Sequence, residues 1–152
     1  MRFPVSGDGA VNEQAAHEAL GLNRNETFYV ISRLDFLDGK PRAIHRSYLN
    51  PSHFPESFLD HDFEKESLLA IINSYGFRIN TRETTLRARF PTQEEAFRLK
   101  IDPAQQPVLE AEQKLTAVHL ATREMVTVEY MHACYLNWEY RIANRRNVRS
   151  VP

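Results

Sequence analysis

The sequence has only one cysteine, which cannot form an internal disulfide and has no CxxC partner for a zinc or redox site. It has no run of about 18 apolar residues, and its first residues, MRFPVSGDGA, lack the hydrophobic stretch of a signal peptide. Basic and acidic residues are nearly balanced, 19 against 20, so no overall positive field attracts nucleic acid. These absences predict a cytoplasmic domain that does not cross a membrane or bind DNA by itself, with Cys134 buried in a strand.

Motifs for catalysis and metal binding are also missing. The six histidines show no HxH or HxxxH spacing, and the chain has no GxSxG, GxGxxG or P-loop motif. The basic residues of segment 141–149 are more typical of a solvated tail than of a DNA contact. We therefore expect no metal, no cofactor and no catalytic residue.

The chain has 152 residues, of which 42% are apolar, and this size suits one domain with a real core. Residues 1–10 carry proline and glycine and little periodicity, as in a linker or chain end. We expect the folded domain to cover residues 11–146 and a flexible tail to cover residues 147–152.

A β-hairpin is the clearest element of the sequence. Residues 28–36 alternate with a period of two, with charge on one face and apolar side chains on the other. Asp38 and Gly39 supply the turn, and the following strand stops at Asn50-Pro51. The hairpin therefore precedes most of the domain.

The remaining pattern predicts an α+β fold. Helices are expected from Asn12 to Gly21, over 64–75, and after the capping box of Thr92 and Glu95. Further strands are expected over 84–90, 107–117 and 125–135, with the apolar pattern continuing at Trp138, Tyr140 and Ile142. Together these elements predict a mainly antiparallel sheet of about five or six strands, with helices packed mostly on one face.

Several charged side chains lie on these otherwise apolar strands. Arg33 and Asp35 lie on the first strand, His45 and Arg46 on the second, and Glu129 on the last. They fit ordinary solvent-facing residues or cross-strand ion pairs. They also fit a pocket in which a guanidinium and carboxylates bind a small polar ligand. The residues alone leave both interpretations open.

Four segments occur in the order and spacing of a known family. They are LGL at Leu20 to Leu22, Arg33 with DGKP and SYLNP, Ser67-Leu68-Leu69 with a later YG, and Glu129 to Tyr135. Over about residues 15–142 the chain resembles the UTRA domain, the effector-sensing half of GntR-type transcriptional regulators of the HutC subfamily. The segment PTQEEAFRLKI resembles the family's short helix. The resemblance implies a chorismate-lyase-like (UTRA) fold.

The resemblance also implies a ligand site. In such domains the positions of Arg33 and Glu129 commonly help to hold the effector, with Tyr135 and the helix-opening Ser67 nearby. Sugar-phosphate-sensing relatives often carry an arginine and a glutamate where this chain has Asp35 and His45. We therefore expect six ligand-binding residues: Arg33, Asp35, His45, Ser67, Glu129 and Tyr135.

The altered charges make a sugar phosphate a poorer fit, so amino acids and organic acids are also candidate effectors. His45 would make the site sensitive to pH. The resemblance implies a homodimer that controls DNA binding allosterically through an N-terminal winged-helix domain that this sequence lacks. The alternatives are a chorismate-lyase-like enzyme, in which an arginine and an acid hold a dicarboxylate, and a dimerisation module with a vestigial pocket.

Overall fold

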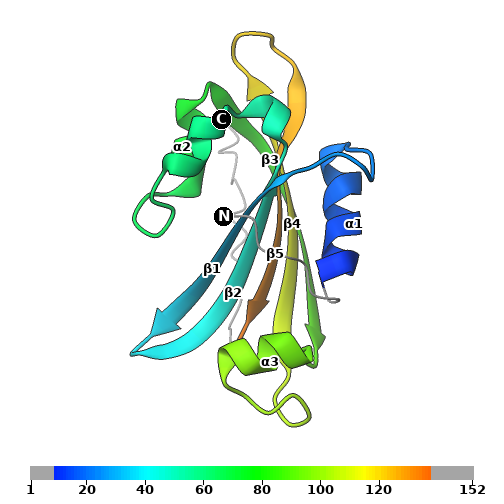
Figure 1. Ribbon diagram of the computed structural model, residues 1–152, viewed down its shortest axis with the longest axis vertical. Coiled ribbons are helices and arrows are strands. Elements are labelled where there is room, and N and C mark those ends of the chain that lie inside the picture. Colours follow the sequence, from blue (N-terminus) through cyan, green and yellow to red (C-terminus); the bar gives the residue numbers. More distant parts are fainter. Residues whose placement is uncertain (1–8, 138–152) are drawn as a thin grey trace, which may run out of the picture.

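A five-stranded antiparallel sheet forms the framework of the computed structural model, which describes residues 9–137 (Figure 1). The strands are β1 (Tyr29–Leu37), β2 (Lys40–Leu49), β3 (Phe77–Arg89), β4 (Val108–His119) and β5 (Met125–Tyr135). Their order across the sheet is β1-β2-β5-β4-β3. The last strand therefore lies at the centre, between the β1-β2 hairpin and the β3-β4 pair.

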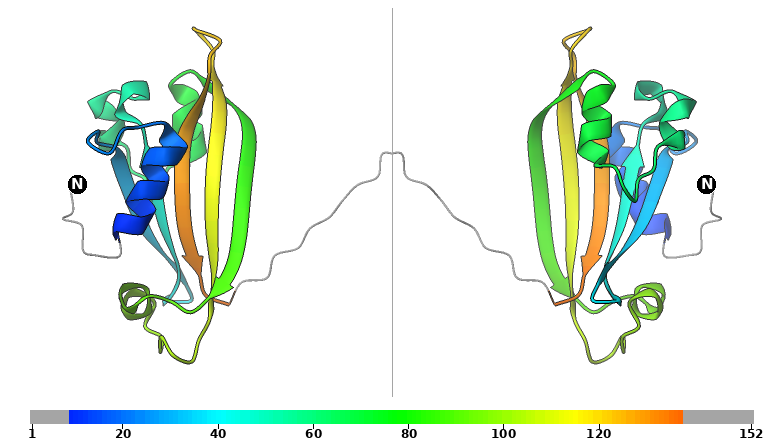
Figure 2. Two further views of the ribbon diagram at one scale, coloured as in Figure 1. Left: turned by 90° about the vertical axis from the view of Figure 1, so that its right-hand side faces the viewer. Right: turned by 90° about the vertical axis from the view of Figure 1, so that its left-hand side faces the viewer.

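Three α-helices and two 3-10 helices accompany the sheet. They are α1 (Gly9–Leu20), η1 (Pro51–His53), η2 (Glu56–Asp60), α2 (Leu68–Ser74) and α3 (Gln93–Leu99). The two views of Figure 2 show α1 and α2 on opposite sides of the sheet. We call the side that packs against α2 the α2 face, and the side that packs against α1 and α3 the α1-α3 face.

The core of the α2 face lies at one end of the sheet. Ile31, Leu49 and Leu115 project from the strands against Ile71 and Ile72 of α2, and all five are buried. The 3-10 helices add two buried aromatic rings to this cluster, Phe54 and Phe58. Burial of these large apolar side chains is the main stabilising term at this end. In Figure 1, α2 lies near this end of the strands and α3 near the other.

The α1-α3 face has two smaller apolar clusters. Ala16 and Leu20 of α1 pack on Tyr48 of β2 and Tyr130 of β5. Leu99 of α3 packs among buried residues of three strands: Ile44, Val108 and Cys134. Cys134 is 1% exposed, as its place in a strand predicts.

Helix termini follow the chemistry of their sequences. Thr92 accepts a hydrogen bond from the Glu95 amide, and the Glu95 carboxylate accepts one from the Thr92 amide, so the predicted capping box is present. Ser67 Oγ accepts a hydrogen bond from the Ala70 amide, and α2 therefore begins at Leu68 rather than near residue 64. Gly21 ends α1 with a φ of +68°, a conformation that glycine adopts without strain.

The structure also corrects two expectations. The third strand begins at Phe77 and not at residue 84. Phe77 and Ile79 pack on the core at its start, but the register shifts after Ile79 and residues 80–85 are all polar, so the apolar alternation is visible only from Leu86 on. Helices lie on both faces of the sheet, since α2 packs opposite α1 and α3. Trp138, Tyr140, Ile142 and the basic tail 141–149 lie outside the described residues. None of the described helices is long and apolar enough to span a bilayer.

Candidate functional site

The hairpin register brings several of the predicted site residues to the α2 face. Arg33 lies opposite His45 across β1 and β2, and Asp35 lies opposite Ala43. Ala43 in turn lies opposite Tyr135 on β5. Since cross-strand partners project from the same side of a sheet, Arg33, Asp35, His45 and Tyr135 share one face.

This arrangement corrects the expected polarity of β1. The charged residues lie on the same face as Ile31, which is 7% exposed in the core under α2. Two apolar residues of the opposite alternation, Val30 and Phe36, are 40% and 59% exposed. The charged side of β1 is therefore its core-facing side, and Arg33 and Asp35 continue the α2 face beyond the apolar core.

His45 is the centre of the polar contacts in this part of the face. Its Nε2 atom lies 2.9 Å from Asp35 Oδ2. Its ring meets the Tyr135 ring edge to face, with centroids 5.2 Å apart. These three residues border a cavity of about 530 Å³, a size suited to a small molecule. The cavity is lined by Asp35, Leu37, Arg42, Ala43, His45, Tyr135 and Asn137.

Two irregularities in the sheet shape the site. On β2 the register shifts so that Phe36 lies opposite Pro41 and Asp35 opposite Ala43, which leaves Arg42 as an extra residue. On β5, Leu115 pairs with Glu129 and Thr116 with Thr127, which leaves Val128 as an extra residue. Such bulges redirect side chains. They allow Arg42 to line the cavity, and they let Glu129 follow the buried Val128 on the same face.

Glu129 is a buried carboxyl group at the inner end of the site, only 5% exposed. Burial raises the pKa of Glu129, while the Ser47 hydroxyl and the Arg33 and Arg82 guanidinium groups oppose that rise. The Ser47 hydroxyl is close enough to act on this carboxyl but makes no hydrogen bond of ordinary geometry. Arg33 therefore acts electrostatically on both Glu129 and His45, at the two ends of the site.

Three buried side-chain atoms in the described part of the chain have no hydrogen-bond partner, and all three lie here. They are Arg33 Nε, His45 Nδ1 and Ser47 Oγ. Arg33 and His45 face each other across the hairpin, and Ser47 is the next residue of β2 on the same face. A buried polar atom without a partner costs about 1–3 kcal/mol. Their concentration at one place makes this part of the α2 face the candidate site.

The protonation of His45 follows from its surroundings. Burial lowers the pKa of His45; the Asp35 carboxylate opposes this, and Arg33 adds to it. A neutral imidazole carries one N–H, and the carboxylate of Asp35 can only accept, so Nε2 carries the hydrogen. Nδ1 is then a bare acceptor. Burial also raises the pKa of Tyr135, with Asp35 adding to the effect.

Five of the six predicted residues therefore lie on one face, and Ser67 does not join them. Its hydroxyl caps α2 and the residue is exposed. Sequence reasoning missed Ser47 and Arg42. The alternation His45, Ser47 on one strand could have identified Ser47, whereas Arg42 depends on a bulge that no pattern marks. Arg46, on the other face, pairs with Glu94 of α3 at 2.6 Å and is an ordinary structural contact.

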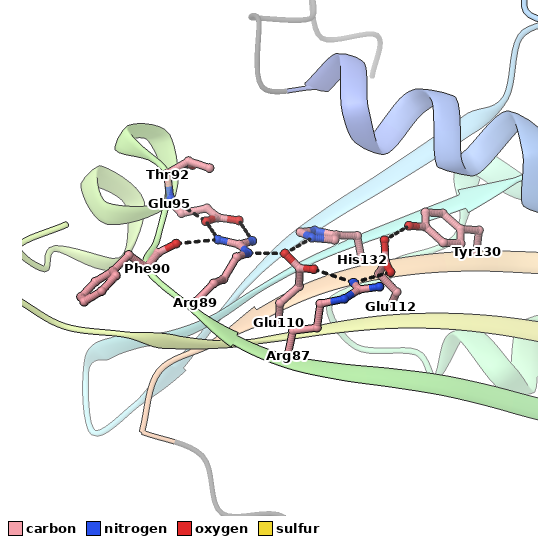
Figure 3. Close-up of polar contacts among 9 residues, drawn as sticks. All are labelled: Arg87, Arg89, Phe90, Thr92, Glu95, Glu110, Glu112, Tyr130 and His132. Atoms are coloured by element: carbon pink, nitrogen blue, oxygen red, sulfur yellow. Dashed lines mark hydrogen bonds and ion pairs between the residues drawn. The ribbon is translucent and has the colours of Figure 1, made fainter. Parts of the chain in front are cut away.

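The α1-α3 face carries a second polar group, drawn in Figure 3, which we call the ionic network. It joins Arg87 and Arg89 of β3, Glu110 and Glu112 of β4, Tyr130 and His132 of β5, and Glu95 of α3. Arg89 holds both oxygens of the buried Glu95, at 2.7 and 2.8 Å, and also contacts Glu110. Arg87 bridges Glu110 and Glu112, at 3.0 and 2.6 Å.

The network fixes α3 to the edge of the sheet. Tyr130 donates a hydrogen bond to Glu112, at 2.9 Å, and His132 Nε2 lies 3.5 Å from Glu110. The hydrogen bonds from Arg89 hold the pKa of Glu95 and Glu110 below the ordinary value against the effect of burial. Among the described residues, no buried side-chain nitrogen or oxygen of this network lacks a partner.

Comparisons with known proteins agree with this fold. Residues 10–135 match the model of the UTRA domain family. No curated protein matches the chain. Within residues 9–137, no three His, Cys, Asp or Glu side chains converge in a way that could hold a metal ion.

Solved structures of regulators share the fold. The C-terminal domain of the histidine utilization repressor from Pseudomonas syringae pv. tomato str. DC3000 is 18% identical, with 86% of each chain covered and a TM-score of 0.70. A GntR-family transcriptional regulator from Bacillus cereus is 20% identical, over 85% of this chain and 87% of that one, with a TM-score of 0.71. The effector domain of PhnF from Mycobacterium smegmatis is 20% identical, over 80% and 70%, with a TM-score of 0.68.

Proposed function

The chain belongs to the UTRA domain family, and from this premise we propose that it is the effector-binding domain of a GntR-type transcriptional regulator of the HutC subfamily. It binds a small polar metabolite in the cytoplasm. The ligand site is the part of the α2 face that carries Arg33, Asp35, His45, Glu129 and Tyr135, and we call it the effector site.

One observation carries the proposal. The three buried and unpaired polar atoms of the described chain all lie in the effector site, beside a buried carboxyl group. A purely structural polar group completes its hydrogen bonds within the protein, because unpaired buried atoms destabilise the fold. A site that meets a ligand leaves its hydrogen-bonding groups available.

The site is placed where a ligand can act on the domain as a whole. It spans β1, β2 and β5, and one end adjoins the apolar core under α2. A ligand that binds one arrangement of these elements more tightly shifts a homodimer toward the conformation with that arrangement. The shift changes the spacing of the N-terminal winged-helix domains on DNA. With a net charge of −1, the chain presents no overall positive field to DNA phosphates.

Binding is favoured over the chorismate-lyase alternative. The structures that share the fold are named as transcriptional regulators or their effector domains. A dimerisation module with a vestigial pocket has less support, because an unused pocket has no reason to keep unpaired polar atoms buried.

A thermal-shift experiment tests the proposal. The domain is screened against sugar phosphates, amino acids, organic acids and phosphonates, since a ligand that binds only the folded state raises the melting temperature with concentration. A hit is repeated with Arg33→Ala, and with Arg87→Ala as a matched control on the opposite face. We expect the first variant to lose the shift and the control to retain it. A shift that survives Arg33→Ala, or chorismate turnover by the wild type, contradicts the proposal.

A further inference from the structure

The unpaired atoms of the effector site require different hydrogen-bonding groups on a ligand. Arg33 Nε–H is a donor, so it requires an acceptor on the ligand. His45 Nδ1 is an acceptor, because Nε2 gives its hydrogen to Asp35, so it requires a donor on the ligand. A ligand that satisfies both carries an acceptor and a donor group.

The two groups must be close together in the ligand. Arg33 and His45 are direct partners across the antiparallel hairpin, and the Cβ atoms of such partners are about 4.5–5.5 Å apart. One small molecule can therefore contact both. The cavity of about 530 Å³ that borders Asp35 and His45 has room for a small amino acid. Arg33 does not line this cavity but lies next to it, across the hairpin from His45.

The charges around these atoms define the donor more closely. Two carboxyl groups belong to the site: Asp35 beside His45, and Glu129 on the far side of Arg33. A hydroxyl group satisfies the His45 acceptor but adds no charge, whereas a protonated amine also attracts the carboxylates. The phosphate group of a phosphate ester is mostly a dianion at neutral pH, so it offers little hydrogen to His45 Nδ1 and meets Asp35 with repulsion.

Resting on the proposed function, we propose that the effector is an amino acid, whose carboxylate accepts from Arg33 and whose ammonium group donates to His45 Nδ1 on the Asp35 side of Arg33. Glu129, on the far side of Arg33, adds negative charge from a greater distance. Ser47, which lies on the same face and can donate or accept, completes the polar contacts. The ligand that fits these groups is therefore a zwitterion and not a phosphate.

The test uses matched compounds on the whole domain. The probes are the twenty common L-amino acids with β-alanine and 4-aminobutyrate, the corresponding amines without the carboxylate, and the corresponding 2-hydroxy acids without the amine. Glucose 6-phosphate, glucosamine 6-phosphate and inorganic phosphate form the contrasting set. We expect at least one amino acid to raise the melting temperature. The amine and the 2-hydroxy acid that correspond to it should each bind at least about tenfold more weakly, since each loses a charged hydrogen bond.

Two variants locate the binding. Asp35→Asn replaces an acceptor by a group that can donate to Nε2 and so favours the imidazole form with hydrogen on Nδ1. We expect it to weaken amino acid binding by at least about tenfold, and the ¹⁵N resonances of the His45 ring to report the change of form. Asp35 is half exposed, so the variant keeps its fold. Arg33→Lys keeps the positive charge but removes the Nε donor, and the same loss is expected.

The outcomes separate the two proposals. If a phosphate compound or a hydroxy acid binds best, and Arg33→Ala abolishes its effect, the amino acid proposal is wrong and the effector-binding function stands. If no compound of any class changes the melting temperature, both are overturned. Amino acid binding that Asp35→Asn and Arg33→Lys leave unchanged places the ligand elsewhere and also overturns this inference.

Discussion

The two polar regions of the sheet lie on opposite faces and differ in how their hydrogen bonds are completed. In the ionic network every buried side-chain nitrogen and oxygen has a protein partner, and Arg87 and Arg89 each contact two carboxylates. In the effector site, Arg33, His45 and Ser47 each keep a buried atom without one. Charge content alone does not distinguish the regions, because both combine arginine, glutamate and histidine.

Completed and incomplete hydrogen bonding distinguish a structural polar region from a binding region in this sheet. A completed network holds elements together, here α3 against β3 and β4. An incomplete one costs free energy that the remainder of the fold must supply, and a bound ligand recovers part of it. Substitutions in the network are therefore expected to change stability and leave binding intact, and substitutions in the effector site are expected to do the reverse.

The largest effect is expected from Glu95→Ala in the network. The substitution removes both hydrogen bonds to Arg89 and half of the capping box of α3, and it leaves Glu110 as the one carboxylate that still pairs with the partly buried guanidinium. Breaking such a pair costs about 3 kcal/mol of unfolding free energy. Urea denaturation measures it. Ligand affinity, measured by calorimetry under folding conditions, should stay within about twofold of wild type. A large loss of affinity with little loss of stability would reverse the roles of the two regions.

The next effect is expected from Arg33→Ala in the effector site. Removing the donor to the ligand acceptor lowers affinity by about 100-fold, equivalent to about 2.7 kcal/mol. The unfolding free energy should change less than the affinity, because Arg33 Nε has no hydrogen-bond partner to lose and only the electrostatic effect of Arg33 on Glu129 and His45 is removed. Calorimetric titration and urea denaturation on the same samples check both statements. Arg87→Ala, on an exposed arginine of the network, is the control that keeps ligand affinity.

Sequence reasoning predicted the elements that obey a simple period. The alternation along β1 fixes which of its residues share a face, and the turn at Asp38-Gly39 fixes the register of the hairpin beside it. It failed where one extra residue interrupts the alternation. The bulges at Arg42 and Val128 decide which side chains enter the site, and they depend on pairing between strands far apart in the chain.

The pairings of the ionic network could not be predicted from the sequence for a related reason. Arg87 and Arg89 are visible as the charged side of a strand, but their partners on β4 depend on the antiparallel register of β3 and β4. The contact with Glu95 depends in addition on where α3 packs. Such pairings follow from tertiary structure, and a charged strand face carries no mark that separates a network from a binding site.

Glu129→Gln, in the effector site, is expected to have a smaller effect on stability than Glu95→Ala, and in the opposite direction. Burial raises the pKa of Glu129, so the folded state disfavours the carboxylate, and this group lowers stability as pH rises through its raised pKa. Glutamine removes that cost, and the variant at pH 7 should be at least as stable as wild type. Affinity for an amine-bearing ligand should fall about tenfold, or about 1.4 kcal/mol. A variant that unfolds more easily and binds normally would instead make Glu129 a structural partner of Arg33.

The smallest effect is expected in the pH dependence of stability, where the two regions behave alike. Burial lowers the pKa of His132 in the network and of His45 in the effector site. At His132, Glu110 and Glu95 oppose the lowering of the pKa and Arg89 adds to it. At His45, Asp35 opposes the lowering of the pKa and Arg33 adds to it. The unfolded chain protonates more readily, so stability should fall as pH decreases below about 6.5.

Replacing either histidine by glutamine should flatten this slope by about 0.5 kcal/mol per pH unit, measured by urea denaturation between pH 5 and pH 8. The ligand separates the two. With a saturating ligand that contacts His45 Nδ1, the contribution of His45 grows because protonation also opposes binding, whereas that of His132 stays the same. Equal responses of both histidines to the ligand would show that the ligand does not use His45 and would remove the functional difference between the two faces.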